Sequence, residues 1–122
     1  MKRITLGMLV GALLLVMVAG VASAATFVCD SNPCFGTNND DMIGEQDERG
    51  ASDDIRARDG ADQINARRAG DDRDVLRGQD GRDDLVADDG DGRDTLDGGP
   101  GRDSCRGDRG DTFRSCRTID RV

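Results

Sequence analysis

A short motif recurs along residues 36–114: an apolar residue with an aspartate two places before it and polar residues around it. In its clearest copies, at residues 60–64, 81–85, 92–96 and 101–105, a glycine stands two places before the aspartate. Because side chains alternate between the two faces of a strand, this pattern predicts short strands that each bury one side chain. The eight predicted strands are centred on Ile43, Ile55, Ile64, Leu76, Leu85, Leu96, Cys105 and Phe113.

The fullest repeat, GGPGRDSCR at residues 98–106, joins a glycine-rich turn to one of these strands. It resembles the nonapeptide repeat G-G-x-G-x-D-x-U-x, with U apolar, of the haemolysin-type (RTX) calcium-binding family. The resemblance implies a parallel β-roll, in which the first six residues of each repeat form a turn that binds Ca²⁺ and the last three form a strand. The other repeats lack one or both of the opening glycines.

The spacing of the apolar positions adds a further regularity. Successive steps are 12, 9, 12, 9, 11, 9 and 8 residues, so long and regular turns alternate. Three-residue strands are not stable alone, but they can share one core when they stack in parallel. With two repeats per coil, the expected fold is all-β: a parallel β-roll (β-solenoid) of about four coils over residues 36–114, with disulfide-tied ends.

The regular turns, at residues 36–41, 57–62, 78–83 and 98–103, then lie on one side of the roll, called here the regular flank. Carboxylate and carbonyl oxygens are the ligands that Ca²⁺ prefers, and four stacked turns frame up to three sites. The turn ending at Asp83 borders two of these sites. The candidate ligands on this flank are Asp41, Asp62, Asp83, Asp103, Gly36, Gly60, Gly78, Gly81, Gly98 and Gly101.

On the opposite side, the extended flank, longer turns precede the aspartates, and the last turn is truncated. The extra residues are expected to pull the ligands out of register with one another. The secondary candidate ligands on the extended flank are Asp53, Asp74, Asp94 and Asp111.

Arginine directly precedes a ligand-position aspartate at Arg73, Arg82, Arg93 and Arg102. In one interpretation, the arginines point outward and offset repulsion among the carboxylates, which leaves a modest calcium affinity. In the other, they pair with the aspartates in a roll that has lost its metal. The first is favoured because a solvated ion pair is weak, whereas a cation with several oxygen ligands is bound more strongly.

The composition excludes several classes of function. The 122-residue chain has a net charge of −8, 34% charged residues and 2% aromatic residues, and 23 of its 25 acidic residues are aspartates. Such a chain lacks the positive charge and stacking surfaces that bind nucleic acid. Lys2 is the only lysine and histidine is absent, so the commonest general bases and Schiff-base residues are missing. We therefore predict neither an enzyme nor a nucleic-acid-binding protein.

The N-terminus has the organisation of a secretory signal peptide. A basic start at Lys2 and Arg3 precedes an apolar run and the small-residue pattern Ala22-Ser23-Ala24, so cleavage is expected after Ala24. The alternative is an uncleaved membrane anchor, because the apolar run is long enough to reach across a bilayer. Cleavage would leave a secreted chain, with net charge −10, that makes no stable membrane insertion.

Four cysteines in a secreted chain without histidine indicate disulfides rather than zinc ligands. Cys29 and Cys34 would close a small loop in an N-terminal cap at residues 25–35. Cys105 would tie the C-terminal cap, residues 115–122, across the open end of the roll through Cys116. The alternative is that Cys105 is only a small buried apolar residue.

Taken together, the repeats, the leader and the cysteines predict a secreted protein that binds calcium ions through Asp/Gly turns and is stabilised by them. A second hypothesis is an extracellular interaction or cell-surface module with a degenerate, partly metal-free roll, whose protein partner is unknown. A third is a disordered acidic chain, which the low hydrophobicity allows but the ordered spacing of apolar residues disfavours.

Overall fold

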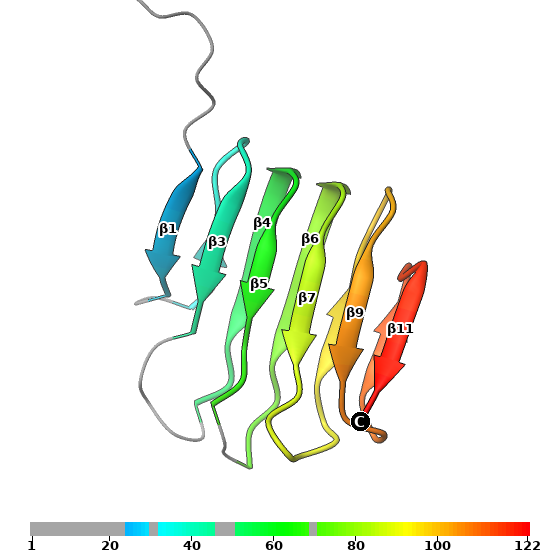
Figure 1. Ribbon diagram of the computed structural model, residues 1–122. Coiled ribbons are helices and arrows are strands. Elements are labelled where there is room, and N and C mark those ends of the chain that lie inside the picture. The colour runs from blue at the N-terminus through cyan, green and yellow to red at the C-terminus, as the bar shows by residue number, and fades with distance from the viewer. Residues whose placement is uncertain (1–23, 30–31, 46–50, 69–70) are drawn as a thin grey trace, which may run out of the picture.

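The computed structural model describes residues 24–29, 32–45, 51–68 and 71–122. The predicted signal peptide therefore lies outside the described residues, apart from Ala24. Within them the chain is all-β and forms two parallel sheets that face each other (Figure 1). The first sheet contains β1 (Ala25–Val28), β3 (Asp41–Gly44), β5 (Gln63–Asn65), β7 (Asp84–Ala87), β9 (Ser104–Gly107) and β11 (Thr118–Arg121). The second contains β2 (Cys34–Phe35), β4 (Asp54–Gly60), β6 (Val75–Gly81), β8 (Thr95–Asp97) and β10 (Thr112–Arg114).

Successive strands alternate between the two sheets, so each pair of strands makes one coil of a β-solenoid of about four turns. The register places the predicted apolar residues directly above one another. In the first sheet Ile64 pairs with Ile43 and with Leu85, which in turn pairs with Cys105. In the second sheet the paired file is Ile55, Leu76, Leu96 and Phe113. The predicted β-roll with two repeats per coil is confirmed.

The core is one large side chain wide in each sheet. Six large aliphatic side chains are at most 2% exposed, namely Ile43, Ile55, Ile64, Leu76, Leu85 and Leu96. The inward positions two residues further on carry small residues, such as Ala57, Ala66 and Ala87, which are fully buried. The aspartates occupy the inward positions two residues before the large apolar residues. Alternation within the strand therefore places each aspartate on the same face as the core, which is why its carboxylate is buried.

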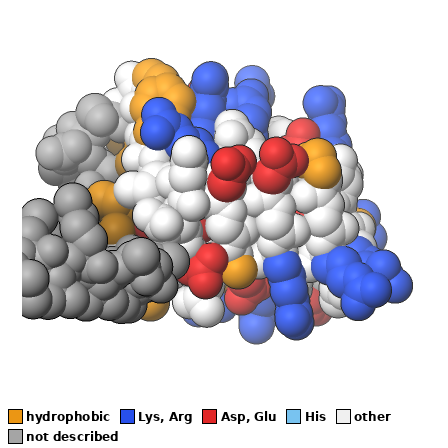
Figure 2. All heavy atoms as spheres, turned by 90° about the horizontal axis from the view of Figure 1, so that it is seen from above, with side chains coloured by type: hydrophobic (Ala, Val, Ile, Leu, Met, Phe, Trp, Pro, Cys, Tyr) orange, Lys and Arg blue, Asp and Glu red, His pale blue; other side chains and the backbone are white. Residues whose placement is uncertain are grey.

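The turns of the regular flank stack through their backbones. A Cβ added to Gly81 would overlap the carbonyl oxygen of Gly60, and one added to Gly101 would overlap that of Gly81. Where the repeat lacks its second glycine, Arg58 and Gln79 adopt the positive φ angles of 83° and 74° themselves. The missing glycines therefore leave the turn conformation intact. Figure 2 looks down on this flank and shows arginines along both sides of a band of uncharged atoms.

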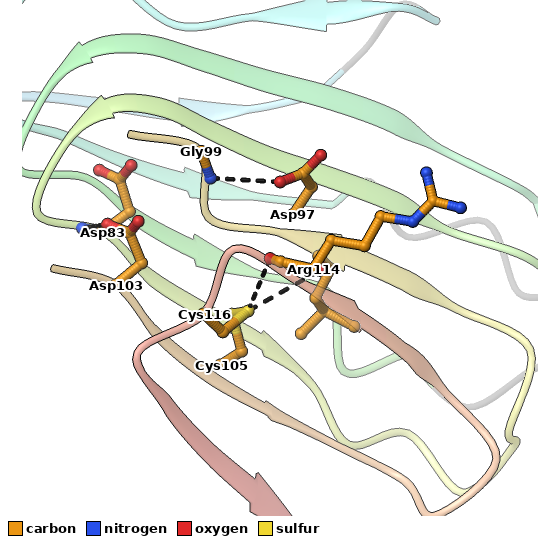
Figure 3. The surroundings of a disulfide bond; sticks show 8 residues. Asp83, Asp97, Gly99, Asp103, Cys105, Arg114 and Cys116 are labelled. Carbon is orange, nitrogen blue, oxygen red and sulfur yellow. Dashed lines mark hydrogen bonds between the residues drawn. A yellow bond between two sulfur atoms is a disulfide. The ribbon is translucent and has the colours of Figure 1, made fainter. Parts of the chain in front are cut away.

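Disulfides close both ends of the roll, as predicted. Cys29 is bonded to Cys34, and Cys105 to Cys116, with Cα–Cα distances of 5.5 and 5.9 Å. Figure 3 shows the second bond beside Asp83 and Asp103. The segments expected as caps are themselves partly strands, because β1 and β2 precede the first repeat and β11 extends the first sheet beyond β9.

Candidate functional site

The aspartates of the regular flank form a ladder that runs from coil to coil. The backbone N–H of Asp41 donates to Asp62 Oδ1 at 2.8 Å, and that of Asp62 donates to Asp83 Oδ1 at 3.0 Å. The N–H of Asp83 donates to Asp103 Oδ1 at 2.9 Å (Figure 3). All four residues are at most 2% exposed. The structure therefore brings the predicted aspartates of this flank into one buried row.

The extended flank carries an equivalent ladder. The N–H groups of Asp53, Asp74 and Asp94 donate to Oδ1 of the aspartate one coil further on, at 2.8, 2.8 and 3.0 Å. The last acceptor in this row is Asp111. The expectation that longer turns pull these residues out of register is wrong. The extra residues lie between the strands, while the coil-to-coil hydrogen bonds keep each aspartate in its place.

One residue of each ladder differs from most of the others. At the N-terminal end of the ladder on the regular flank, Asp41 Oδ2 accepts the Thr37 N–H at 2.6 Å and the Thr37 hydroxyl at 2.9 Å. At the C-terminal end of the ladder on the extended flank, Asp111 Oδ2 accepts the Asp108 N–H at 2.6 Å. Five other carboxylates have no such donor: within the described part of the chain, Oδ2 lacks a hydrogen-bond partner in Asp62, Asp74, Asp83, Asp94 and Asp103.

These five oxygens need a positive or protonated partner. A buried polar atom without a hydrogen bond costs about 1–3 kcal/mol, and more when it carries charge. Carboxylate oxygens are ligands for hard cations, so the residues fit the Ca²⁺ that the repeat pattern implies. The glycines at the turn entrances leave room around some of the carboxylates. A Cβ on Gly98 would lie only 2.6 Å from Asp103 Oδ2, and one on Gly78 would collide with Asp83 Oδ2.

The arginines that directly precede ladder aspartates do not neutralise those aspartates. Arg73, Arg82, Arg93 and Arg102 are all exposed. Among the described residues, no ion pair joins an arginine to a ladder aspartate at positions 74, 83, 94 or 103, and Arg93 instead lies 4.0 Å from Asp71. The geometry agrees with the interpretation in which these side chains point outward.

Carboxylates outside the predicted set also gather on the extended flank. Each group has one ligand atom per residue within 4.8 Å of the others, and the groups are Glu45/Asp53/Asp74, Asp72/Asp74/Asp89 and Asp72/Asp91/Asp94. Sequence analysis missed Glu45, Asp72, Asp89 and Asp91. Glu45 could have been noticed because it follows Ile43 by two residues, where six of the seven other repeats have alanine or glycine. The regular flank shows no such three-carboxylate group over the residues that are described.

Burial perturbs the protonation of these groups. The pKa is raised to about 6 in Asp62 and Asp74, to about 7 in Asp83 and to about 8 in Asp94, and desolvation by burial is the largest cause. Neighbouring carboxylates contribute to the increase, and the backbone N–H that each Oδ1 accepts opposes it. Desolvation likewise raises the pKa of Glu45 to about 8. In the absence of a cation, the fold therefore favours the protonated carboxyl groups.

The stability of the metal-free roll should fall as the pH rises. A carboxyl whose pKa is raised on folding binds more protons in the folded state, so folding becomes less favourable between about pH 4 and pH 8. We expect circular dichroism in the presence of a chelator to show more β-structure at pH 5 than at pH 8. Saturating calcium should remove this difference, because the cation takes the place of the protons. A metal-free chain that gains structure from pH 5 to pH 8 would contradict this assignment.

Comparison with protein-family models, with curated proteins and with solved structures found no match to this chain. The described residues contain no helix of the length and apolarity needed to span a membrane. The functional assignment therefore depends on the site itself. The solenoid carries two ladders of aspartates, and further carboxylates beside one of them could hold metal ions.

Proposed function

We propose that this chain is a secreted calcium-binding protein whose Asp/Gly turns bind Ca²⁺ and thereby stabilise the β-roll. The observation that carries the proposal is a difference among the ladder carboxylates. Oδ2 of Asp41 and Oδ2 of Asp111 each receive a backbone donor, whereas five other ladder Oδ2 atoms receive none. An ion between coils would satisfy these five atoms in the way that Thr37 and Asp108 satisfy Asp41 and Asp111.

Export is part of the proposal. The signal-peptide pattern and the two disulfides support an oxidising, calcium-rich compartment outside the cytosol. No catalytic role is proposed, because the chain offers no histidine and no lysine beyond Lys2 for acid–base or covalent chemistry.

Calorimetric titration with Ca²⁺ tests the proposal, using Asp83→Asn for the regular flank. Asparagine keeps an oxygen that can accept the Asp62 N–H but replaces the unpartnered oxygen by an amide nitrogen. We expect fewer bound ions, or affinity at the affected sites weaker by on the order of tenfold, since calcium affinity follows the charge of its ligands. Asp74→Asn should cause a comparable loss, because Asp74 is in register on the extended flank.

Asp80→Asn is the matched control for charge. Asp80 is in the same turn as Asp83 but is exposed and belongs to neither ladder, so its substitution should leave the stoichiometry unchanged. Wild-type binding in both ladder variants would contradict the proposal. It would favour a roll held together by protonated carboxyl groups.

The second candidate, an extracellular interaction module, is favoured by one feature of the surface. An open groove of about 750 Å³ runs beside the regular flank, and three exposed arginines from successive coils line it, namely Arg82, Arg102 and Arg117. Such a row suits an acidic partner. This function would become the preferred one if the titration detected no calcium binding.

A further inference from the structure

We propose that the extended flank holds an additional cation site of a different construction, a carboxylate centre around Asp72 that binds a hard divalent cation of the calcium type. The centre, called here the Asp72 centre, comprises Asp72, Asp74, Asp89, Asp91 and Asp94. The inference rests on the proposed function, because the Asp72 centre would bind the same class of cation as the ladders. It differs from the ladders because three of its residues come from the long turns.

The geometry of the centre is two carboxylate trios that share Asp72. One trio adds Asp74 and Asp89, the other adds Asp91 and Asp94, and within each trio the ligand atoms lie within 4.8 Å of one another. This arrangement gives a cation at least three charged oxygens without help from the backbone. On the regular flank, by contrast, each coil offers one ladder aspartate.

Three buried residues of the centre carry a carboxylate oxygen without a hydrogen-bond partner. Asp72 is 5% exposed, and its Oδ1 has no hydrogen-bond partner in the described part of the chain. Asp74 and Asp94 are at most 1% exposed, and their Oδ2 atoms are equally unpartnered. Each trio thus contains Asp72 and one further carboxylate that is more than nine-tenths buried, Asp74 or Asp94, and all three of these residues carry an unpartnered oxygen. Uncompensated acidic residues of this kind are costly unless a cation binds them.

Backbone hydrogen bonds assemble the centre despite its charge. The Asp72 N–H donates to Asp91 Oδ2 at 3.1 Å, and the Asp91 N–H donates to Asp89 Oδ1 at 3.0 Å. No arginine among the described residues forms an ion pair with any of the five carboxylates. The turns therefore hold like charges together and leave their neutralisation to a bound ion.

The donor set identifies the class of ion. Every side-chain ligand in the centre is a carboxylate. The chain has no histidine, and all four cysteines are in disulfides, so neither a histidine nitrogen nor a free thiol can contribute. Oxygen-only, highly charged sites suit Ca²⁺, whereas zinc sites generally include nitrogen or sulfur ligands.

The test is calcium titration of the disulfide-intact protein carrying Asp72→Asn, with Asp71→Asn as the matched control. Asp71 is the neighbouring residue, but its side chain is 87% exposed and points toward Arg93. We expect Asp72→Asn to lose at least one bound Ca²⁺, or to weaken it by tenfold or more, while Asp71→Asn binds like the wild type. Equal stoichiometry and affinity in the wild type and in Asp72→Asn would overturn the proposal.

Two further variants keep this test decisive. If Asp72→Asn fails to fold at saturating calcium, Asp89→Asn tests the same centre from a half-buried residue outside the ladders, and binding like the wild type would then overturn the proposal. Asp83→Asn separates this inference from the proposed function. Loss of calcium in Asp83→Asn but not in Asp72→Asn would mean that only the ladders bind; the reverse would mean that only the Asp72 centre does.

Discussion

Removal of calcium should unfold most of the roll, and its return at roughly 0.1–1 mM should restore the β-structure, since this is the range of extracellular calcium modules. The physical reason is the balance between a thin core and crowded charge. Each sheet buries a file one large side chain wide, while five ladder carboxylates carry an oxygen without a hydrogen-bond partner among the described residues. Far-UV circular dichroism during chelation and calcium titration measures the effect.

Magnesium provides the control for this experiment. Mg²⁺ demands octahedral geometry and gives up its water reluctantly, so the same concentration should restore much less structure than Ca²⁺. Both disulfides should stay oxidised throughout, so that the metal is the only variable. A well-folded spectrum that chelation does not change would exclude metal-dependent folding while leaving the β-roll itself intact.

Gly81→Ala should strongly destabilise the roll even at saturating calcium. The new Cβ would overlap the carbonyl oxygen of Gly60 in the adjacent coil, and Gly81 has a φ of +141°, which side chains disfavour. The obstacle is backbone on the neighbouring turn, so it cannot be relieved by a rotamer change. We expect a loss of stability on the order of 3–5 kcal/mol, measured by urea unfolding in calcium.

Gly90→Ala is the matched control. Gly90 also has a positive φ, +104°, but an added Cβ there meets no atom within 4 Å. Only the conformational cost of about 1–3 kcal/mol remains, so this variant should still fold in calcium. Equal effects of the two substitutions would mean that the conformation of the glycine, rather than the contact between coils, decides stability.

The architecture could be predicted because each repeat has the same order of inward residues: an aspartate, a large apolar residue and, in most repeats, a small residue. The alternating 12- and 9-residue steps already separate Ile43, Ile64 and Leu85 from Ile55 and Leu76, and the two sheets reproduce that separation. The missing glycines do not change the turns. The structure shows that Gln79 takes the required positive φ without one.

The candidate site was harder to predict because much of it depends on the path of the long turns. Turn length suggested that Asp74 and Asp94 are displaced, yet their place is set by the strands they precede and by hydrogen bonds to the next coil. Asp72, Asp89 and Asp91 stand outside the repeat, and no periodic pattern places them together. Their proximity is a property of how two successive turns stack.

The hydrogen bonds of the ladders also impose a direction on assembly. Apart from the last residue of each row, every ladder aspartate amide donates to a carboxylate that comes later in the sequence, as from Asp62 to Asp83 and from Asp83 to Asp103. A coil that folds before the next one therefore has an aspartate amide that still awaits its acceptor. The Cys105–Cys116 bond likewise joins the strand of one coil to a residue that follows the last repeat. A truncation before Cys116 would thus remove this cross-link while leaving the hydrogen bonds between the earlier coils in place.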